Sequence, residues 1–216
     1  MQITHLGHAC LLVESEGGAR VLVDPGAFSA GFEALVGLDA VVVTHQHADH
    51  LDVERLLPLL AANPQARLLV EPGTLDAADP TSATVAFAPS QSHDLGDLTI
   101  EAVGGRHAVN HDRVPTVGNI GLLMSERSGR TLFHPGDSYA DTPDGVDILA
   151  LPLNAPWCRV SETLDFLHAV TPGIVFPIHD GLLSEAGRGG YLMHVANFGP
   201  DSTELRELSD GSPVSL

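Results

Sequence analysis

Short apolar runs alternate with glycine- and proline-containing turns along most of the chain. Runs rich in β-branched and aliphatic residues between such turns predict β-strands. The predicted strands cover residues 2–6, 9–14, 20–24, 39–43, 67–70, 84–87, 98–103, 118–125, 130–134, 147–151 and 174–178. Because tight turns separate the first three runs, we expect the chain to begin with a hairpin-rich sheet.

Helical patterns are confined to a few short segments between the strands. Asp52 is a suitable N-cap for a helix over residues 52–60, although Pro58 is expected to bend or end it. Further helices are predicted over residues 74–78, over 161–170 with Ser161 as the N-cap, and over 202–208. From residue 210 onward we expect a turn with a short edge strand, or a frayed end. Strands interspersed with helices, without a fixed repeat, predict a layered α/β sandwich.

Composition narrows the class of protein. The 216 residues are 44% hydrophobic, which predicts one domain over residues 1–216. The net charge is −18 and every basic side chain is an arginine, so we expect no nucleic-acid partner. The N-terminus lacks a basic segment followed by an apolar one, and no apolar run reaches membrane-spanning length. We therefore expect a cytoplasmic protein that does not bind membranes.

The most specific chemistry lies in residues 44–50, which read Thr-His-Gln-His-Ala-Asp-His directly after a predicted strand. Imidazole and carboxylate are good ligands for divalent cations, and this cluster supplies enough of them for more than one ion. The predicted ligands are His45, His47, Asp49 and His50. With only Cys10 and Cys158, in no Cys-x-x-Cys spacing, the chain cannot form a cysteine-rich zinc finger, and a disulfide is unsupported.

Three further ligand candidates each follow a predicted strand. His107 comes after residues 98–103, Asp137 after the strand that begins at residue 130, and His179 after residues 174–178. Loops at strand ends are where a rigid scaffold presents functional side chains, so four loops could converge on one cleft. His111 is an alternative to His107 in the same loop. Taken alone, Asp137 would be a turn residue and His179 a strand-end histidine, and their order behind residues 44–50 makes them ligand candidates.

The order of these motifs resembles that of the metallo-β-lactamase-fold hydrolases over nearly the whole chain. The opening Leu-Gly-His-Ala-Cys-Leu-Leu-Val-Glu, residues 6–14, is similar to the small metal-dependent hydrolases that include the ascorbate-6-phosphate lactonase-like proteins. The resemblance implies a four-layer αββα metallo-β-lactamase-like sandwich with a binuclear metal site at the edge between its sheets. It implies that one ion is held by His45, His47 and His107, the other by Asp49, His50 and His179, with Asp137 as the bridge.

Departures from this resemblance argue against three of the superfamily's activities. His47 stands where oxygen-reducing di-iron members carry a glutamate, and Asp137 stands where the best-known antibiotic-cleaving members carry a cysteine. No extra domain or RNA-binding arm, as in the nucleases, is visible at this length and charge. Hydrolysis of a small ester, lactone or phosphoester is therefore the leading hypothesis. The alternatives are a phosphodiesterase acting on a nucleotide and a metal-binding protein without catalysis.

The expected cofactors are two divalent ions, zinc foremost, although Mn, Fe or Ni would also suit such ligands. A bound ion lowers the pKa of water from about 15.7 toward roughly 7, so that a metal-bound hydroxide can attack. We expect Asp49 and Asp137 to orient that hydroxide or move its proton, and Asp24 to accept a hydrogen bond from a ligating imidazole. The expected partner is a small-molecule substrate, and a homo-oligomer is compatible with the sequence.

Several polar residues are left with open roles. His8 is either a cleft residue near the metals or a turn histidine, and Trp157 with Arg159 contacts either the substrate or the core. His93 is placed in a polar turn, and His134 is expected to bond a neighbour. His111 and His194 have no assigned role. The arginines near motif loops or the glycine-rich residues 187–190, where a phosphate group could bind, are Arg106, Arg113, Arg159 and Arg188.

Overall fold

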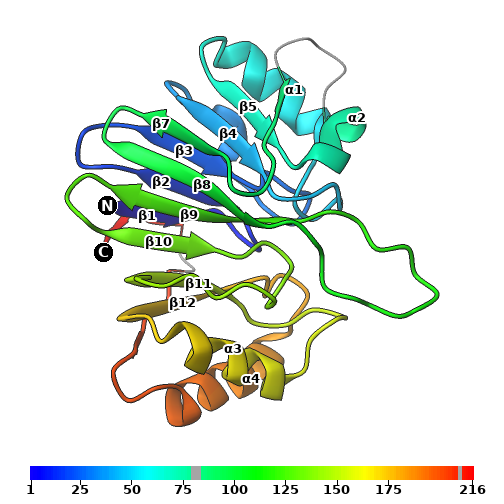
Figure 1. Ribbon diagram of the computed structural model, residues 1–216, viewed down its shortest axis with the longest axis vertical. Coiled ribbons are helices and arrows are strands. Elements are labelled where there is room, and N and C mark those ends of the chain that lie inside the picture. The colour runs from blue at the N-terminus through cyan, green and yellow to red at the C-terminus, as the bar shows by residue number, and fades with distance from the viewer. Residues whose placement is uncertain (79–83, 209–210) are drawn as a thin grey trace.

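Two seven-stranded mixed sheets face each other in the computed structural model, which describes residues 1–78, 84–208 and 211–216 (Figure 1). The first sheet has the order β14-β1-β2-β3-β4-β5-β6, and the second has the order β13-β12-β11-β10-β9-β8-β7. The strands of the first sheet are β1 (Gln2–His5), β2 (Leu11–Glu14), β3 (Arg20–Val23), β4 (Ala40–Val43), β5 (Arg67–Val70), β6 (Thr84–Ala86) and β14 (Val214–Ser215). Those of the second are β7 (Ser92–Leu95), β8 (Leu98–Gly104), β9 (Ile120–Glu126), β10 (Thr131–His134), β11 (Ile148–Pro152), β12 (Ile174–Ile178) and β13 (Glu204–Leu205).

Helices cover the outer face of each sheet (Figure 1). The helices α1 (Val53–Ala62) and α2 (Leu75–Ala78) pack on the first sheet, together with the short 3₁₀ helices η1 (Phe32–Ala34) and η2 (Pro72–Thr74). The helices α3 (Val160–Val170) and α4 (Glu185–Phe198) pack on the second sheet. The order of layers is helix, sheet, sheet, helix, so the predicted αββα sandwich is confirmed.

Burial on both faces explains why β4 is apolar throughout. Ala40 and Val42 point into the core between the two sheets, while Val41 and Val43 pack under α1 with Leu56. Successive side chains of a strand point to opposite faces, so a central strand with both faces covered has no polar position. The polar residues 44–50 begin directly after this strand, and Thr44, His45 and His50 among them are also buried.

The predicted strands are present with ends that differ by one or two residues, but three other assignments were wrong. Residues 202–208 do not form a helix, because Glu204–Leu205 pair as β13 with the edge of β12. His93 lies in strand β7 and its ring packs on Phe87, whereas a polar turn was predicted. Helix α3 begins at Val160, and its N-cap is Arg159, whose backbone N–H donates to the Glu162 carboxylate at 2.7 Å, and not Ser161.

Helix boundaries depend on packing as well as on local signals. Asp52 caps α1 as predicted, since its side chain accepts a hydrogen bond from the N–H of Arg55. Pro58 does not end α1, because it lies on the exposed side while Leu56 and Leu59 anchor the buried side. Helix α4 was not predicted at all, because glycines interrupt its apolar pattern. Beyond residue 210, which lies outside the described residues, Val214–Ser215 form the edge strand β14.

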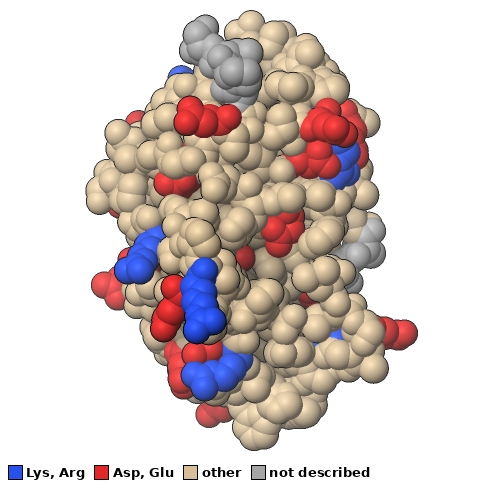
Figure 2. Space-filling view, turned by 90° about the vertical axis from the view of Figure 1, so that its right-hand side faces the viewer, with Lys and Arg blue, Asp and Glu red and all other residues tan. Residues whose placement is uncertain are grey.

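The surface is acidic over the face drawn in Figure 2. Acidic side chains are scattered across it, and the basic side chains lie mostly at the lower left, with others elsewhere, including one among acidic side chains at the upper right. Within the described part of the chain, no helix is both long enough and apolar enough to cross a membrane. Cys10 and Cys158 are both free thiols.

Candidate metal centre

Four loops at one edge of the two sheets bring the seven predicted ligands together. The loop after β4 carries four of them, and the loops after β8, β10 and β12 carry His107, Asp137 and His179. Their ligand atoms form two groups, and within each group the atoms lie within 4.8 Å of one another. One group is His45, His47, His107 and Asp137; the other is His8, Asp49, His50 and His179. The arrangement offers two candidate cation sites.

Asp137 lies between the two groups. Its Oδ1 is 3.1 Å from His50 Nε2 and 3.2 Å from His179 Nε2, and its Oδ2 is 3.4 Å from His107 Nε2. The loop that carries it turns at Gly136, which has a φ of 60° and leaves no room for a Cβ beside Asn119. This position therefore requires glycine, and the turn directs the carboxylate between the two groups.

Hydrogen bonds fix the orientation of three of the imidazoles. Nδ1 donates to Asp24 Oδ2 in His50 (2.7 Å), to the Ala108 carbonyl in His107 (2.6 Å) and to the Asn154 carbonyl in His179 (2.7 Å). In each ring Nε2 is then the atom that faces the centre. These three Nε2 atoms and Asp137 Oδ1 are buried and make no hydrogen bond. Buried polar atoms without partners are rare in proteins, so the donor set fits bound cations.

His45 and His47 face each other in the first group. Thr44 Oγ1 donates to Asp24 Oδ2 at 2.7 Å and can then accept from His45 Nδ1 at 3.0 Å. This leaves His45 Nε2 only 3.1 Å from His47 Nδ1. Two nitrogen lone pairs at that distance repel unless a proton or a cation lies between them, so both atoms suit the same ion.

Asp24 supports the second group from behind. The residue is fully buried and its carboxylate accepts hydrogen bonds from Thr44 N (2.8 Å), Thr44 Oγ1 and His50 Nδ1. Its φ of 47° is in the left-handed region, which aspartate tolerates better than most residues. The structure therefore places Asp24 where the sequence predicted it, against a ligand candidate.

His8 is buried beside the second group and supports Asp49. The Gly181 N–H donates to His8 Nδ1 at 3.2 Å, so the ring proton is on Nε2, which donates to Asp49 Oδ2 at 3.1 Å. A nitrogen that carries a proton cannot bind a cation. His8 is thus a positioning residue for Asp49: it stands in a turn, with a φ of 50°, and its ring belongs to the second ligand group, so both parts of the open alternative hold.

Trp157 contacts the centre directly, whereas Arg159 does not. Trp157 Nε1 donates to Asp137 Oδ2 at 2.9 Å. The guanidinium of Arg159 pairs with Glu162 at 2.8 Å, and 80% of the Arg159 side chain is exposed. A cavity of ≈ 200 Å³ over the two groups is lined by Trp157 together with His47, Asp49, His107, Asn110, Asp137, Pro156, His179 and Leu182. Arg159 is not among these described residues.

The remaining histidines are structural or lie away from the ligand atoms. His134 accepts from the Gly136 N–H and donates to the Ala9 carbonyl, so it stabilises the turn before Asp137. His111 is exposed and its ring accepts from the Arg113 N–H. His194 bonds the Gly190 carbonyl within α4. The structure brings His107, and not His111, to the ligand groups.

Sequence reasoning missed Asn119. Its Oδ1 accepts from the Asp137 N–H at 2.9 Å and its Nδ2 donates to the Pro135 carbonyl at 3.0 Å, so it clamps the loop after β10. A single asparagine before a strand carries no pattern that would reveal this role. Gly26 was also missed, and a Cβ there would clash with the backbone of Asp49.

Carboxylates set the protonation of His179 and His50. Burial alone would lower the pKa of His179, but Asp137 and Asp49, at 3.2 and 3.4 Å from Nε2, raise that pKa to about 9. Burial is likewise outweighed at His50, where Asp137 and Asp24 raise the pKa well above its ordinary value. Cation binding at these rings must therefore displace protons at neutral pH.

We expect chelator-treated protein to lose stability as the pH rises. A histidine pKa raised on folding stabilises the fold fully below its ordinary value of 6.5, and this contribution is lost as the pH rises through about 9. The free energy of unfolding in urea should fall between these two pH values. Zn²⁺-saturated protein should not show that fall, because the cation replaces the proton. Equal stability of the chelated protein at both pH values would contradict the raised pKa of His179.

An αββα sandwich with histidine and aspartate ligands at the edge between its sheets defines the metallo-β-lactamase fold. The metallo-β-lactamase fold protein YhfI from Bacillus subtilis superposes with a TM-score of 0.70 at 17% identity, covering 99% of this chain and 98% of that one. The Beta-lactamase superfamily domain matches residues 2–179. The chain therefore belongs to the beta-lactamase superfamily.

Two relatives match most or all of the chain. Protein Rv0786c of Mycobacterium tuberculosis is 42% identical over 217 residues, which is 100% of both chains. A UPF0173 metal-dependent hydrolase of Carboxydothermus hydrogenoformans is 30% identical over 200 residues, covering 83% of this chain and 84% of the relative. The match to Protein Rv0786c spans all four ligand-bearing loops.

Proposed function

We propose that this protein hydrolyses a small ester, lactone or phosphoester with two divalent cations bound at the two ligand groups. One observation carries the proposal: three buried Nε2 atoms and a buried carboxylate oxygen lack hydrogen-bond partners and are oriented toward one another. A bound divalent cation lowers the pKa of water and polarises the oxygen under attack. The metal-dependent hydrolase named among the relatives supports the same activity.

The position of each residue in the centre suggests whether it would bind a cation or transfer a proton. His45, His47 and His107 would hold one cation, and His50, His179 and Asp49 the other, with Asp137 between them. The Asp49 side chain is 22% exposed and lines the cavity, while that of Asp137 is 5% exposed. Asp49 is therefore the carboxylate that can pass a proton to a leaving group, and His8 holds it in place.

Zinc is the cation we propose first. Its sites are commonly built from histidine nitrogen and carboxylate oxygen, and open positions beside such ligands are typical of catalytic zinc. Manganese, iron and nickel accept the same ligand types, so cellular supply contributes to the choice. Residues 6–14 resemble those of the lactonase-like proteins, so a lactone is the substrate that we propose in the narrower form of the proposal.

Elemental analysis and a substrate panel test the proposal together. We expect one to two divalent ions per purified chain, and turnover of at least one lactone, aryl ester or bis-phosphodiester with Zn²⁺ or Mn²⁺. Prolonged dialysis against a chelator should remove the activity, and added Zn²⁺ should restore it. Protein that binds no divalent ion would refute the metal centre. Metal-loaded protein that is silent across the panel would favour a binding protein without catalysis.

A further inference from the structure

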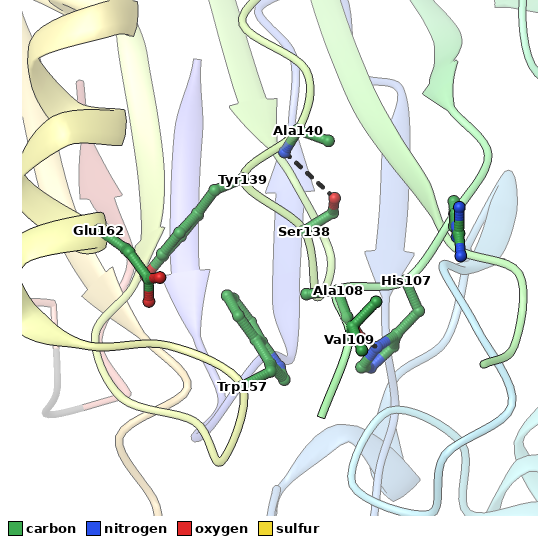
Figure 3. A pocket seen from close by; sticks show the side chains of 9 residues that line it. His107, Ala108, Val109, Ser138, Tyr139, Ala140, Trp157 and Glu162 are labelled. Atoms are coloured by element: carbon green, nitrogen blue, oxygen red, sulfur yellow. Dashed lines mark hydrogen bonds between the residues drawn. The ribbon is translucent and has the colours of Figure 1, made fainter. Parts of the chain in front are cut away.

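A second cavity adjoins the metal centre and has a different character. It measures ≈ 370 Å³, a size typical of small-molecule sites. It is lined by Arg106, His107, Ala108, Val109, Ser138, Tyr139, Ala140, Trp157 and Glu162 (Figure 3). We call it the side pocket. His107 and Trp157 line both this pocket and the smaller cavity over the ligand groups, so one molecule can occupy the two together.

The polar groups of the side pocket are largely engaged with the protein. Tyr139 directs its hydroxyl to the Pro152 carbonyl and to Thr163 Oγ1. Ser138 Oγ accepts from the Ala140 N–H at 3.2 Å (Figure 3). The Glu162 carboxylate is bound by the N–H and the guanidinium of Arg159, which also lower its pKa. The surface left for a ligand consists mainly of aromatic rings and aliphatic carbon.

Exposed apolar side chains line both cavities, and a further one lies against His8. Val109, which lines the side pocket, is 48% exposed, and Leu182, which lines the cavity over the ligand groups, is 60% exposed. Phe28 is 48% exposed and its ring lies edge-on to His8 at 5.2 Å. The loop that carries Val109 projects from the body between β8 and β9 (Figure 1). Apolar groups gathered around a polar centre indicate an apolar ligand.

One positively charged side chain of the side pocket, Arg106, has no acidic partner among the described residues. Arg106 is exposed, and the described residues place no carboxylate within ion-pair distance of it. Five of the ten arginines, at positions 20, 55, 159, 188 and 206, pair with acidic groups. Of the five without an ion pair among the described residues, at positions 67, 106, 113, 127 and 130, Arg106 is the one that lines the side pocket. In a chain with a net charge of −18, an unpaired guanidinium beside the site suits an anionic group on the ligand.

We propose that the side pocket receives an alkyl or aryl group of the substrate and that Arg106 receives an anionic group on the same molecule. This inference rests on the proposed function, and it narrows the substrate to an amphiphilic ester or lactone. The reacting carbonyl lies over the ligand groups, and the apolar group passes between His107 and Trp157. A small polar ester would leave the side pocket unfilled and would bind weakly.

Trp157 permits a test of binding that does not depend on turnover. It is the only tryptophan in the chain, so tryptophan fluorescence reports on the side pocket and the adjoining cavity, both of which Trp157 lines. Metal-loaded protein is titrated with alkan-1-ols and with alkane-1-sulfonates, whose anionic group is a poor metal ligand. We expect up to about fourfold tighter binding for each added methylene from four to eight carbons. Hexane-1-sulfonate should bind at least about threefold more tightly than hexan-1-ol.

Two variants, each with a matched control, test whether the binding preferences come from the side pocket or from a general change in the protein. Arg106→Gln should remove the preference for the sulfonate, while Arg130→Gln, at an exposed arginine in the β9–β10 turn, should not. Ala140→Phe should flatten the dependence on chain length by filling the pocket, while Ala61→Phe, exposed on α1, should not. Circular dichroism and metal content confirm that each variant is folded and loaded.

Hydrolysis of 4-nitrophenyl esters from acetate to octanoate distinguishes the two proposals. A KM that falls with chain length in the wild type, and not in Ala140→Phe, supports the side pocket. Hydrolysis with the same KM for every chain length, together with unchanged Trp157 fluorescence, would overturn the pocket and leave the hydrolase intact. Chain-length-dependent binding at Trp157 in metal-loaded protein that turns over no substrate would refute the proposed function and leave the pocket standing.

Discussion

Asp137→Asn is expected to reduce the bound metal from two ions to one or fewer and to lower kcat/KM by about 10³-fold. Asp137 is the residue that approaches both groups, with Oδ1 at 3.1 and 3.2 Å from His50 and His179 Nε2. An amide keeps the shape and can still accept from Trp157, but it loses the negative charge that offsets two cations. Elemental analysis and hydrolysis of the best substrate measure the two effects together.

A neighbouring aspartate provides the control for that variant. Asp144 is exposed in the loop between β10 and β11 and has no ion-pair partner among the described residues. Asp144→Asn should therefore keep both the metal content and the activity of the wild type. If Asp137→Asn retained two ions and full activity, its placement between the cations would have to be abandoned.

Asp24→Asn is expected to destabilise the fold by about 3 kcal/mol and to weaken cation binding at the His50 group by about 10–100-fold. The Asp24 carboxylate accepts three hydrogen bonds at a fully buried position. Thr44 N donates to Oδ1, whereas Thr44 Oγ1 and His50 Nδ1 donate to Oδ2, so asparagine, with one oxygen and one NH₂ group, must turn its NH₂ group toward one of these sets of donors. With the NH₂ group at the Oδ2 position, the His50 proton would move to Nε2, the atom that faces the cation.

Urea unfolding of chelated protein and Zn²⁺ titration of folded protein measure these two effects separately. Asp39→Asn is the matched control, because Asp39 also accepts a backbone N–H, from Arg20 at 2.8 Å, but does so on the surface. Its cost should be less than about 1 kcal/mol. Wild-type cation affinity in Asp24→Asn would show that His50 does not depend on this carboxylate for its orientation.

Strands were predictable where burial alone dictates the residue type. The runs of β4, β5 and β12 are mostly apolar and mostly buried on both faces, so their composition predicts a strand without knowledge of the neighbouring strands. Helix α4 was not predictable in this way. Gly187, Gly189 and Gly190 lower its helix propensity, and it buries Leu192 and Val195 against the second sheet to compensate.

The prediction of a helix over residues 202–208 was wrong because strand pairing outweighed the local helix preference. Their mixture of charged residues and leucine suits a helix, but the free edge of β12 offers backbone hydrogen bonds to Glu204 and Leu205. A single sequence contains no sign that this edge is open. Local preference was therefore overridden by pairing with a strand that begins 30 residues earlier in the chain.

The side chains able to bind a cation could be identified from the sequence alone. Residues 44–50 follow a buried strand, so their imidazoles and carboxylate must emerge together at its end, whatever the rest of the fold. The distant candidates His107, Asp137 and His179 could be proposed because each also ends a strand. Folding brings those strand ends to one edge, because β8, β10 and β12 share one sheet that faces β4.

The orientation of each ligand atom depends instead on contacts between segments far apart in the chain. Asp24 orients His50, the Asn154 carbonyl orients His179, and Gly181 sets the proton on His8. Hydrogen-bond partners of this kind have no spacing rule in the sequence, since they meet only after both sheets have packed. Residue order therefore specified which side chains can bind a cation, and long-range packing specified which of their atoms face it.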